Sequence, residues 1–259
     1  MNTKPKVCIL RSDGTNCDED LFYAFEKSGA QPIMVHVNEL RSKNRKLSDF
    51  QILALPGGFS YGDDLASGKV LAVELMSFFK NDLQTFVDKN GYVLGVCNGF
   101  QTLIRTGLLP FTTLGTMQAT LTNNDSGHFE CRFVKIKAEK SNASYFNDLN
   151  IIMDVSVNSG EGKLFADKAV LNRLEQEKLV VFRYVDRLEK PTQHYPENPN
   201  GSLRSIAGIT DKTGRILGLM PHPEKFVDIT QHPNWRRENF TTPHGLPFFE
   251  RIVKFVRTS

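Results

Sequence analysis

Residues 92–107 decide the fold of this chain; they read Tyr92-Val-Leu-Gly95-Val-Cys97-Asn98-Gly99-Phe-Gln101-Thr-Leu-Ile-Arg-Thr-Gly107. The first five residues are an apolar run with β-branched members, which is typical of a buried strand. Gly95 and Gly99 stand two residues before and after Cys97, the spacing of a nucleophile elbow, where a strand turns sharply into a helix. The helix expected to follow points its positive N-terminus at the cysteine and favours the thiolate. The stretch therefore predicts a strand, a reactive cysteine and a helix in succession.

A structural interpretation of Cys97 competes with the catalytic one. A free cysteine at the end of a strand usually serves as a small buried hydrophobic residue. The two flanking glycines favour the elbow but leave both interpretations open, so the remainder of the chain has to decide between them.

The composition is that of an ordinary soluble globular protein, with 259 residues, 40% of them hydrophobic and 24% charged. A net charge of +3 and scattered basic residues do not indicate nucleic-acid binding, and the basic run Arg41–Lys46 is interpreted as a solvated loop. No membrane span or signal-peptide core is found. The four cysteines show neither paired spacing nor a C-x-x-C zinc motif, so we expect a cytoplasmic protein without disulfides.

Apolar periodicity predicts alternating strands and helices in the first half of the chain. Strands are expected at residues 6–10, 32–37, 51–55 and 92–96, with helices at 18–28 and 100–106. One long helix is expected between the last two strands, with an apolar face formed by Leu71, Leu75, Phe78, Phe79, Leu83, Phe86 and Val87. Strand–helix–strand units of this kind imply a parallel sheet.

The second half is expected to be richer in short strands and turns. Strands are predicted at 116–121, 129–137, 151–157 and 180–185 and in a hairpin of 205–210 with 215–220, and helices at 170–179 and 247–256. Residues 158–162 are expected to interrupt the strands. Because no linker or repeat is found, the prediction is one α/β domain over residues 1–259. Its sheet is expected to be open, mixed and mostly parallel, flanked by helices, with an added antiparallel portion.

A glycine-rich loop follows the third predicted strand, and ligands of open α/β sheets bind at such carboxyl ends. Gly57, Gly58 and Phe59 can turn backbone N–H groups toward a developing oxyanion, with the N–H of Asn98 as a second donor. The alternative is a glycine turn that binds an anion or nothing.

His222 is the histidine best placed to assist a cysteine nucleophile. It follows the apolar strand 216–220 directly, and prolines on both sides restrict the local backbone. Glu224 could accept the second imidazole N–H and stabilise the imidazolium. A loop histidine satisfied by backbone groups is the alternative. Taken with Cys97 and the glycine loop, the pattern favours a Cys-His-Glu triad, in an order that excludes a simple papain or caspase pattern.

The segments Gly95–Gln101 and Pro221–Glu224 resemble the triad of class I glutamine amidotransferases, which implies a flavodoxin-like fold. Within that class, residues 6–256 resemble the glutaminase component of phosphoribosylformylglycinamidine synthase, the PurQ family. The segments that carry this second resemblance are Arg11–Asp18, Pro56–Asp63, Thr122–Gly127, Gly160–Gly162 and Asn198–Ser202.

The resemblance implies a reaction. Cys97 is expected to attack the carboxamide of L-glutamine, His222 to protonate the departing ammonia, and Glu224 to orient His222, after which water hydrolyses the γ-glutamyl thioester. Gly58 and Phe59 match the oxyanion segment of the family.

Gln101 matches the glutamine that the family places near the amino-acid end of the substrate. Two features depart from the family pattern. Asn158-Ser159 stands where many shorter members have a histidine, so the substrate contacts there are undetermined, and residues 63–68 resemble the longer members.

The resemblance also implies partners. Ammonia is expected to pass through an internal channel to the large subunit of the synthase, which uses ATP and magnesium to convert formylglycinamide ribonucleotide to its amidine in purine biosynthesis. Whether a third small subunit takes part is left open. This chain is expected to hold no cofactor and no metal. It has neither G-x-x-x-x-G-K-S/T nor G-x-G-x-x-G after a strand, so no ATP site is expected in it.

The only tryptophan, Trp235, stands beside Arg236 and Arg237. These residue types are enriched at interface anchors, so part of this segment is expected to face the synthase or line the glutamine site. An ordinary surface loop is the alternative.

Two other functions compete with the glutamine amidotransferase. The first is another cysteine enzyme on a similar sheet, a γ-glutamyl hydrolase or a cysteine peptidase, which would act without a partner. The second is a non-catalytic binding module in which Cys97 is merely buried and reacts with no glutamine-like electrophile.

Overall fold

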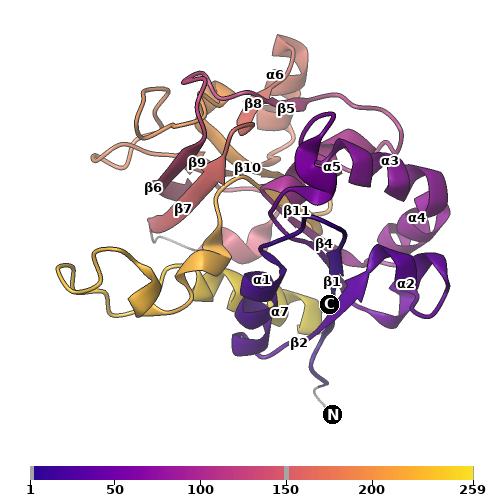
Figure 1. The fold of residues 1–259 in the computed structure, drawn as a ribbon. Helices are drawn as coiled ribbons and strands as arrows, with labels where there is room; N and C mark the ends of the chain where they lie inside the picture. The colour runs from indigo at the N-terminus through magenta and orange to yellow at the C-terminus, as the bar shows by residue number, and fades with distance from the viewer. Residues whose placement is uncertain (1–2, 149–151, 259) are drawn as a thin grey trace.

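The computed structural model describes residues 3–148 and 152–258. The strands are β1 (Lys6–Arg11), β2 (Gln31–His36), β3 (Ile52–Leu55), β4 (Tyr92–Val96), β5 (Thr120–Thr122), β6 (Glu130–Ala138), β7 (Met153–Ser159), β8 (Lys163–Phe165), β9 (Val180–Tyr184), β10 (Ile206–Thr210) and β11 (Ile216–Leu219). Nine of them form one sheet in the order β2-β1-β3-β4-β11-β10-β9-β6-β7 (Figure 1).

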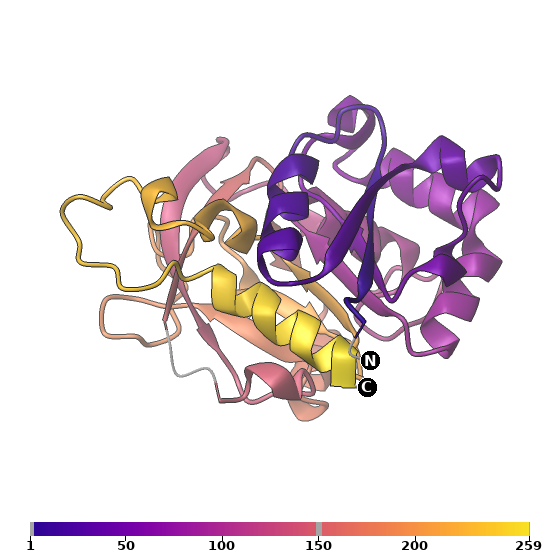
Figure 2. The ribbon, with the colours of Figure 1, turned by 90° about the horizontal axis from the view of Figure 1, so that it is seen from below.

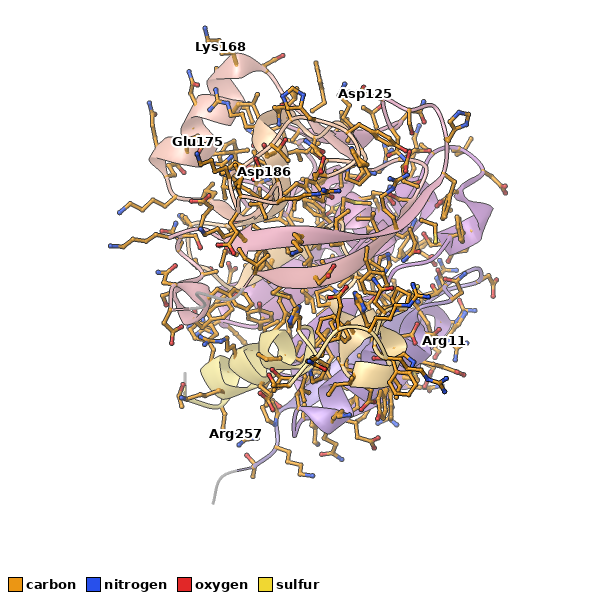
Figure 3. The ribbon with its side chains drawn as sticks, turned by 90° about the vertical axis from the view of Figure 1, so that its left-hand side faces the viewer. Arg11, Asp125, Lys168, Glu175, Asp186 and Arg257 are labelled. Carbon is orange, nitrogen blue, oxygen red and sulfur yellow. The ribbon has the colours of Figure 1, made fainter. Side chains whose placement is uncertain are left out.

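The sheet is mixed, as the sequence predicts. Strands β2, β1, β3, β4 and β11 are paired in parallel. Strands β10, β9, β6 and β7 continue it with antiparallel pairs, so the antiparallel portion is larger than expected. Figure 3 looks onto this antiparallel edge, where β6 and β7 cross the view above the helix that ends near Arg257.

The helices are α1 (Asp18–Lys27), α2 (Val37–Arg41), α3 (Lys69–Phe78), α4 (Lys80–Asp88), α5 (Asn98–Thr106), α6 (Lys168–Gln176) and α7 (Leu246–Thr258). Helices α1 and α7 lie together on one face of the sheet, and α3 and α5 lie together on the other (Figures 1 and 2). Helix α7, which was predicted at 247–256, packs through Phe248, Phe249, Ile252 and Val253; these four residues are buried and form one face of the helix.

The prediction of one long helix after β3 is wrong in one respect. The chain leaves helical geometry at Phe79, where φ is −126°, so that α3 and α4 are separate helices. Phe78 was expected on the buried face but is 59% exposed, and the guanidinium of Arg41 lies 4.1 Å from its ring. The break rotates Phe78 away from the core while Phe79 enters it.

The second half differs from the prediction mainly in where strands begin and end. Of the expected strand 116–121 only residues 120 and 121 are in a strand; they belong to β5, which runs to Thr122 and pairs with β8 in a small sheet of its own. Strand β7 continues through Ser159, so the interruption begins at Gly160, and Ile151 lies outside the described residues. None of the helices in the described ranges is long and apolar enough to cross a membrane.

Four parallel strands bring their carboxyl ends to one edge of the sheet. These are β1, β3, β4 and β11, and the segments that follow them are the loop before α1, the Gly57–Gly58 loop, Cys97 and His222. Strands β3, β4 and β11 are buried along their whole length, so this edge is supported by a rigid core.

Candidate active site

Cys97 occupies the sharp turn that the sequence predicts. Its backbone has φ 50° and ψ −106°, a strained conformation for a residue with a side chain, directly between β4 and α5. A Cβ on Gly95 would lie 2.7 Å from the backbone of Gly99, and one on Gly99 would lie 2.6 Å from the carbonyl carbon of Leu55 and closer still to its oxygen. The two glycines are therefore required, because α5 lies so close to β3 and β4 that a side chain on either glycine would collide with backbone atoms.

His222 and Glu224 form a buried pair beside this turn. The His222 N–H donates to the carbonyl of Ser156 at 2.8 Å, which ties the histidine backbone to β7. Its Nδ1 lies 2.6 Å from Oε1 of Glu224, and each residue is 1% exposed. Glu224 therefore orients the ring, and Nε2 is the nitrogen left for chemistry.

The imidazole of His222 lies near two thiols. A Cβ on Gly57 would lie 2.7 Å from Cε1 of His222 and 3.4 Å from both the Cβ of Cys97 and the Sγ of Cys17. Burial alone lowers the pKa of His222, but the Glu224 carboxylate and the two thiols outweigh it, and the pKa is raised well above its ordinary value. The site therefore favours an imidazolium next to Cys97.

The glycine loop after β3 reaches the same place. Gly58 has φ +131°, and a Cβ there would lie 2.6 Å from the backbone nitrogen of Asn16. The N–H of Phe59 donates to the carbonyl of Gly14 at 3.0 Å, so it is already engaged within the loops. Asn98 is the first residue of α5, where backbone N–H groups have no partner within the helix.

The side chains of Asn98 and Gln101 hold the loops that surround the site. Asn98 Oδ1 accepts from the hydroxyl of Ser60 at 2.6 Å, and its Nδ2 donates to Asp63 Oδ1 at 2.9 Å. Gln101 Nε2 donates to the carbonyl of Glu161. Helix α5 thus fastens the loop after β3 on one side and the loop after β7 on the other.

These contacts enclose a cavity of about 210 Å³ at the sulfur of Cys97. Its lining residues are Gly58, Phe59, Asp63, Ser67, Cys97, Gln101, Phe129, Asn158, Ser159, Gly160 and Glu161. The thiol of Cys97 donates to the carbonyl of Asn158 at 3.7 Å. Phe59 and Phe129 are stacked with 6.2 Å between ring centres and are about half exposed, so they form an aromatic rim.

Three of the segments that carry the subfamily resemblance meet in one buried hydrogen-bond network. Asn200 Nδ2 donates to Asn124 Oδ1 at 2.6 Å and to the hydroxyl of Ser159 at 3.2 Å. Asn124 Oδ1 also accepts from the N–H of Gly162 at 3.0 Å, and its Nδ2 donates to the carbonyl of Ser159. The network holds the 159–162 segment against the cavity.

Sequence reasoning did not identify Ser60, Asp63 and Glu161 as parts of the site. Ser60 and Asp63 lie in the Pro56–Asp63 motif, and Glu161 lies in Gly160–Gly162, so the motifs that carry the family resemblance already included all three residues. Which polar side chain turns inward depends on the conformation of the loop, which motif spacing does not specify.

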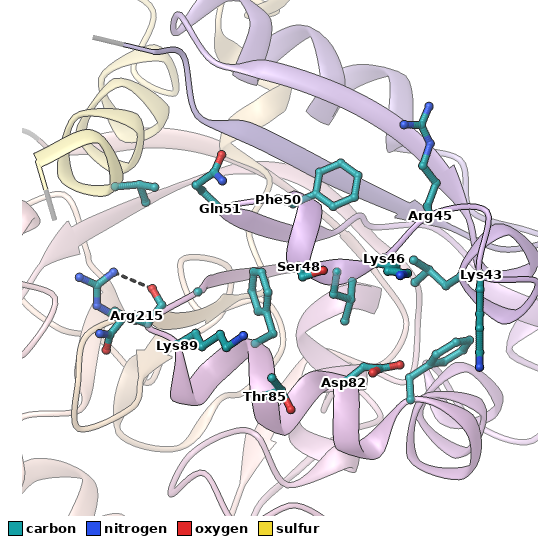
Figure 4. A pocket seen from close by; sticks show the side chains of 17 residues that line it. Lys43, Arg45, Lys46, Ser48, Phe50, Gln51, Asp82, Thr85, Lys89 and Arg215 are labelled. Atoms are coloured by element: carbon teal, nitrogen blue, oxygen red, sulfur yellow. Dashed lines mark hydrogen bonds between the residues drawn. The ribbon is translucent and has the colours of Figure 1, made fainter. Parts of the chain in front are cut away.

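A larger cavity of about 680 Å³ lies at the opposite edge of the sheet, around the starts of β3, β4 and β11. It is lined by Lys43, Arg45, Lys46 and Lys89 and by Arg215, which donates to the carbonyl of Asn90 at 2.9 Å (Figure 4). It contains no cysteine and no histidine, so its size does not make it the reaction site.

The residues around Trp235 are not among those that line the Cys97 cavity. Trp235 is 39% exposed, and the guanidinium of Arg236 lies 4.9 Å from its ring. The alternative in which this segment lines the glutamine site is therefore not supported, and a role at an interface stays a prediction.

Comparison with known proteins shows extensive similarity. The family model of the CobB/CobQ-like glutamine amidotransferase domain matches residues 4–256. The chain is 43% identical over 256 residues to phosphoribosylformylglycinamidine synthase subunit PurQ of Dehalococcoides mccartyi, with 98% of this chain and 99% of that protein covered. It is 38% identical over 250 residues to the subunit of the same name from Thermus thermophilus, with coverage of 96% and 97%.

Solved structures agree with this result. A chain of the PurLQS structure from Thermotoga maritima superposes with a TM-score of 0.74 at 28% identity, covering 98% of this chain and all of that one. The glutaminase domain of CTPS from Trypanosoma brucei, solved with bound acivicin, superposes with a TM-score of 0.58 at 13% identity, with coverage of 98% and 94%. At that identity the second similarity concerns the fold alone.

Proposed function

Because this chain belongs to the family of PurQ subunits of phosphoribosylformylglycinamidine synthase, we propose that its Cys97 cavity releases ammonia from L-glutamine through a Cys97–His222–Glu224 triad. The observation that carries the proposal is the buried His222–Glu224 pair beside the strained Cys97 turn. A thiolate next to an imidazolium is the reactive form of a catalytic cysteine.

In the first half of the reaction, the Cys97 sulfur attacks the carboxamide carbon of glutamine and forms a tetrahedral intermediate. Its oxyanion accepts hydrogen bonds from the backbone N–H groups of Gly58 and Asn98; Phe59 contributes the rim, because its own N–H is bound to Gly14. The carbon–nitrogen bond then breaks, and the imidazolium of His222 gives its proton to the leaving nitrogen.

In the second half, neutral His222 accepts a proton from water as that water attacks the γ-glutamyl thioester. The thioester bond breaks, glutamate leaves, and the sulfur of Cys97 is again paired with an imidazolium. Glu224 keeps the ring in place through both halves.

The ammonia is passed to a synthase partner, by analogy with the PurLQS assembly in which a similar chain was solved. We assign ATP and magnesium to that partner, where formylglycinamide ribonucleotide is converted to its amidine, and no cofactor to this chain. A third small subunit, as the name PurLQS suggests, completes the assembly. The setting is the cytoplasm, where de novo purine synthesis draws on free glutamine.

The test is covalent labelling with 6-diazo-5-oxo-norleucine, an electrophilic mimic of glutamine, followed by mass spectrometry. We expect one adduct at Cys97 and none at Cys8, Cys17 or Cys131. Cys97→Ala should remove both the label and glutamine hydrolysis. An adduct at any other cysteine would contradict the assignment.

The coupling to a partner has its own test. Glutamine hydrolysis by the isolated chain should be weak and should rise when the synthase subunit and ATP are added. Equal rates with and without the partner would favour a free-standing hydrolase of the γ-glutamyl hydrolase or cysteine peptidase kind.

A further inference from the structure

Cys17 is a second buried thiol at the catalytic edge, and the proposed reaction makes no use of it. It precedes α1 and is 7% exposed. Its Sγ donates to the side-chain oxygen of Asn16 at 3.4 Å, a long and weak contact. The thiol therefore lies next to the triad without a strong partner of its own.

Three metal-binding side chains converge at this point. One ligand atom from each of Cys17, His222 and Glu224 lies within 4.8 Å of the other two, and all three residues are buried. Among the described residues, Glu224 Oε2 is buried and has no hydrogen-bond partner. Burying such an atom unpaired is unfavourable, so the cluster is suited to a ligand that engages it.

The donor set indicates which metal would bind. A thiolate, an imidazole and a carboxylate are the usual ligands of Zn²⁺, whereas Mg²⁺ and Ca²⁺ prefer oxygen alone. Zn–S bonds of about 2.3 Å and Zn–N bonds of about 2.0 Å place neighbouring donors of a tetrahedral site about 3.5 Å apart. The three donor atoms already lie within 4.8 Å, so small side-chain shifts complete the geometry.

We propose that Cys17, His222 and Glu224 form a zinc-binding site, and that zinc bound there blocks the glutamine reaction. The blocking rests on the proposed function, because zinc would take the imidazole and carboxylate that the triad requires. Three protein ligands leave one position for water. Binding releases two protons to solvent, the thiol proton of Cys17 and the proton that the imidazolium of His222 gives up to the metal, and involves no change of oxidation state.

The test uses the full chain after removal of metals with a chelator. Co²⁺ serves as the spectroscopic probe, and Zn²⁺ affinity is measured by calorimetry. We expect the sulfur-to-cobalt charge-transfer absorption of a thiolate ligand in the wild type. Cys17→Ser should lose this band and bind zinc at least about 100-fold more weakly, more than the loss of an outer-shell partner causes. Cys131→Ser, which removes an exposed thiol, is the matched control and should behave as the wild type does.

Two further variants separate this proposal from the proposed function. Cys97→Ser should abolish glutamine hydrolysis yet retain the cobalt band, since Cys97 is not a ligand. Glu224→Gln keeps the shape of the site and should also weaken zinc binding, which provides a second measurement if Cys17→Ser is poorly folded. Equal zinc affinity in the wild type and Cys17→Ser, or a cobalt spectrum without the sulfur band, would overturn the site.

The blocking effect is measured by the rate at which 6-diazo-5-oxo-norleucine labels Cys97. Zinc should slow labelling of the wild type at least tenfold, at concentrations that leave the labelling rate of Cys17→Ser unchanged; the tenfold figure is roughly what a site about 90% occupied produces. Equal slowing in both proteins would show that zinc acts elsewhere.

Discussion

Oε1 of Glu224 lies 2.6 Å from Nδ1 of His222, with both residues removed from solvent. An exposed pair of this kind contributes little, but a buried carboxylate strongly favours the charged imidazole. Burial lowers the pKa of His222, and Glu224, Cys97 and Cys17 together raise it well above the ordinary value. Glu224 therefore favours the protonated form of His222 and fixes the orientation of its ring.

Glu224→Gln should lower kcat for glutamine hydrolysis by about 10²- to 10⁴-fold, the range of general acid–base catalysis, with little change in KM. The amide cannot stabilise the imidazolium, although it fills the same space. The measurement is glutamate release under steady-state conditions. Asp228→Asn, which alters a surface carboxylate paired with Lys27, is the control and should leave kcat unchanged. A Glu224→Gln enzyme with wild-type kcat would exclude the triad.

The stability of the protein should depend on pH through His222. Its folded pKa is raised, so the stabilisation is complete below about pH 6.5, the ordinary histidine pKa, and is lost as the pH rises through the folded pKa. Between about pH 6.5 and the folded pKa, the wild type should therefore lose up to about 1.4 kcal/mol of unfolding free energy per pH unit, relative to Glu224→Gln.

Urea unfolding at a series of pH values measures this difference, and groups other than His222 largely cancel between the two proteins. A difference between wild type and variant that grows as the pH rises would have the opposite sign and would contradict the raised pKa.

Asp63→Asn should loosen the loop after β3. Asp63 accepts hydrogen bonds from Asn98 Nδ2 and the Gly68 N–H through Oδ1 and from the Ser67 hydroxyl through Oδ2, and an amide nitrogen cannot accept. We expect faster hydrogen exchange over residues 60–68 and a higher KM. Asp64→Asn, at the exposed neighbouring position, is the matched control. Equal exchange in both variants would show that Asp63 does not hold the loop.

Gly57→Ala should displace the imidazole. The new Cβ would lie 2.7 Å from Cε1 of His222, and the ring is enclosed by protein on all sides. We expect kcat to fall by about 100-fold, as a misplacement of about 1 Å can cause. Circular dichroism establishes that the variant is folded. Wild-type kcat in a folded variant would mean that the ring has room to move without loss of activity.

Local patterns predicted the elements that carry the chemistry. The glycines around Cys97 indicated the elbow, because their spacing reports on the backbone of one short segment. The apolar run before His222 placed that residue at the end of β11 for the same reason. The break at Phe79 was missed, because Phe78 and Phe79 are equally apolar and periodicity does not reveal which of them faces the core.

The sequence did not predict which distant segments of the chain contact one another. The backbone N–H of Asn98 was expected to face the oxyanion and Gln101 to lie near the substrate, and both stay predictions; the sequence did not indicate that the side chains of these two residues hold the neighbouring loops. The Phe59 N–H was expected to face the oxyanion, but it is bound to Gly14. Both outcomes depend on how the loops after β1, β3 and β7 pack against α5, and no spacing within one segment encodes that packing.

The amino-acid order by itself predicted an α/β sheet, a cysteine at a strand end and a histidine–glutamate pair near the end of another strand. Spacing and periodicity suffice there, because each of these features is set by a few neighbouring residues. Only the tertiary structure placed Cys17 against His222 and Glu224, although no linear zinc motif links them. It did so because parallel strands far apart in the chain end at the same edge of the sheet.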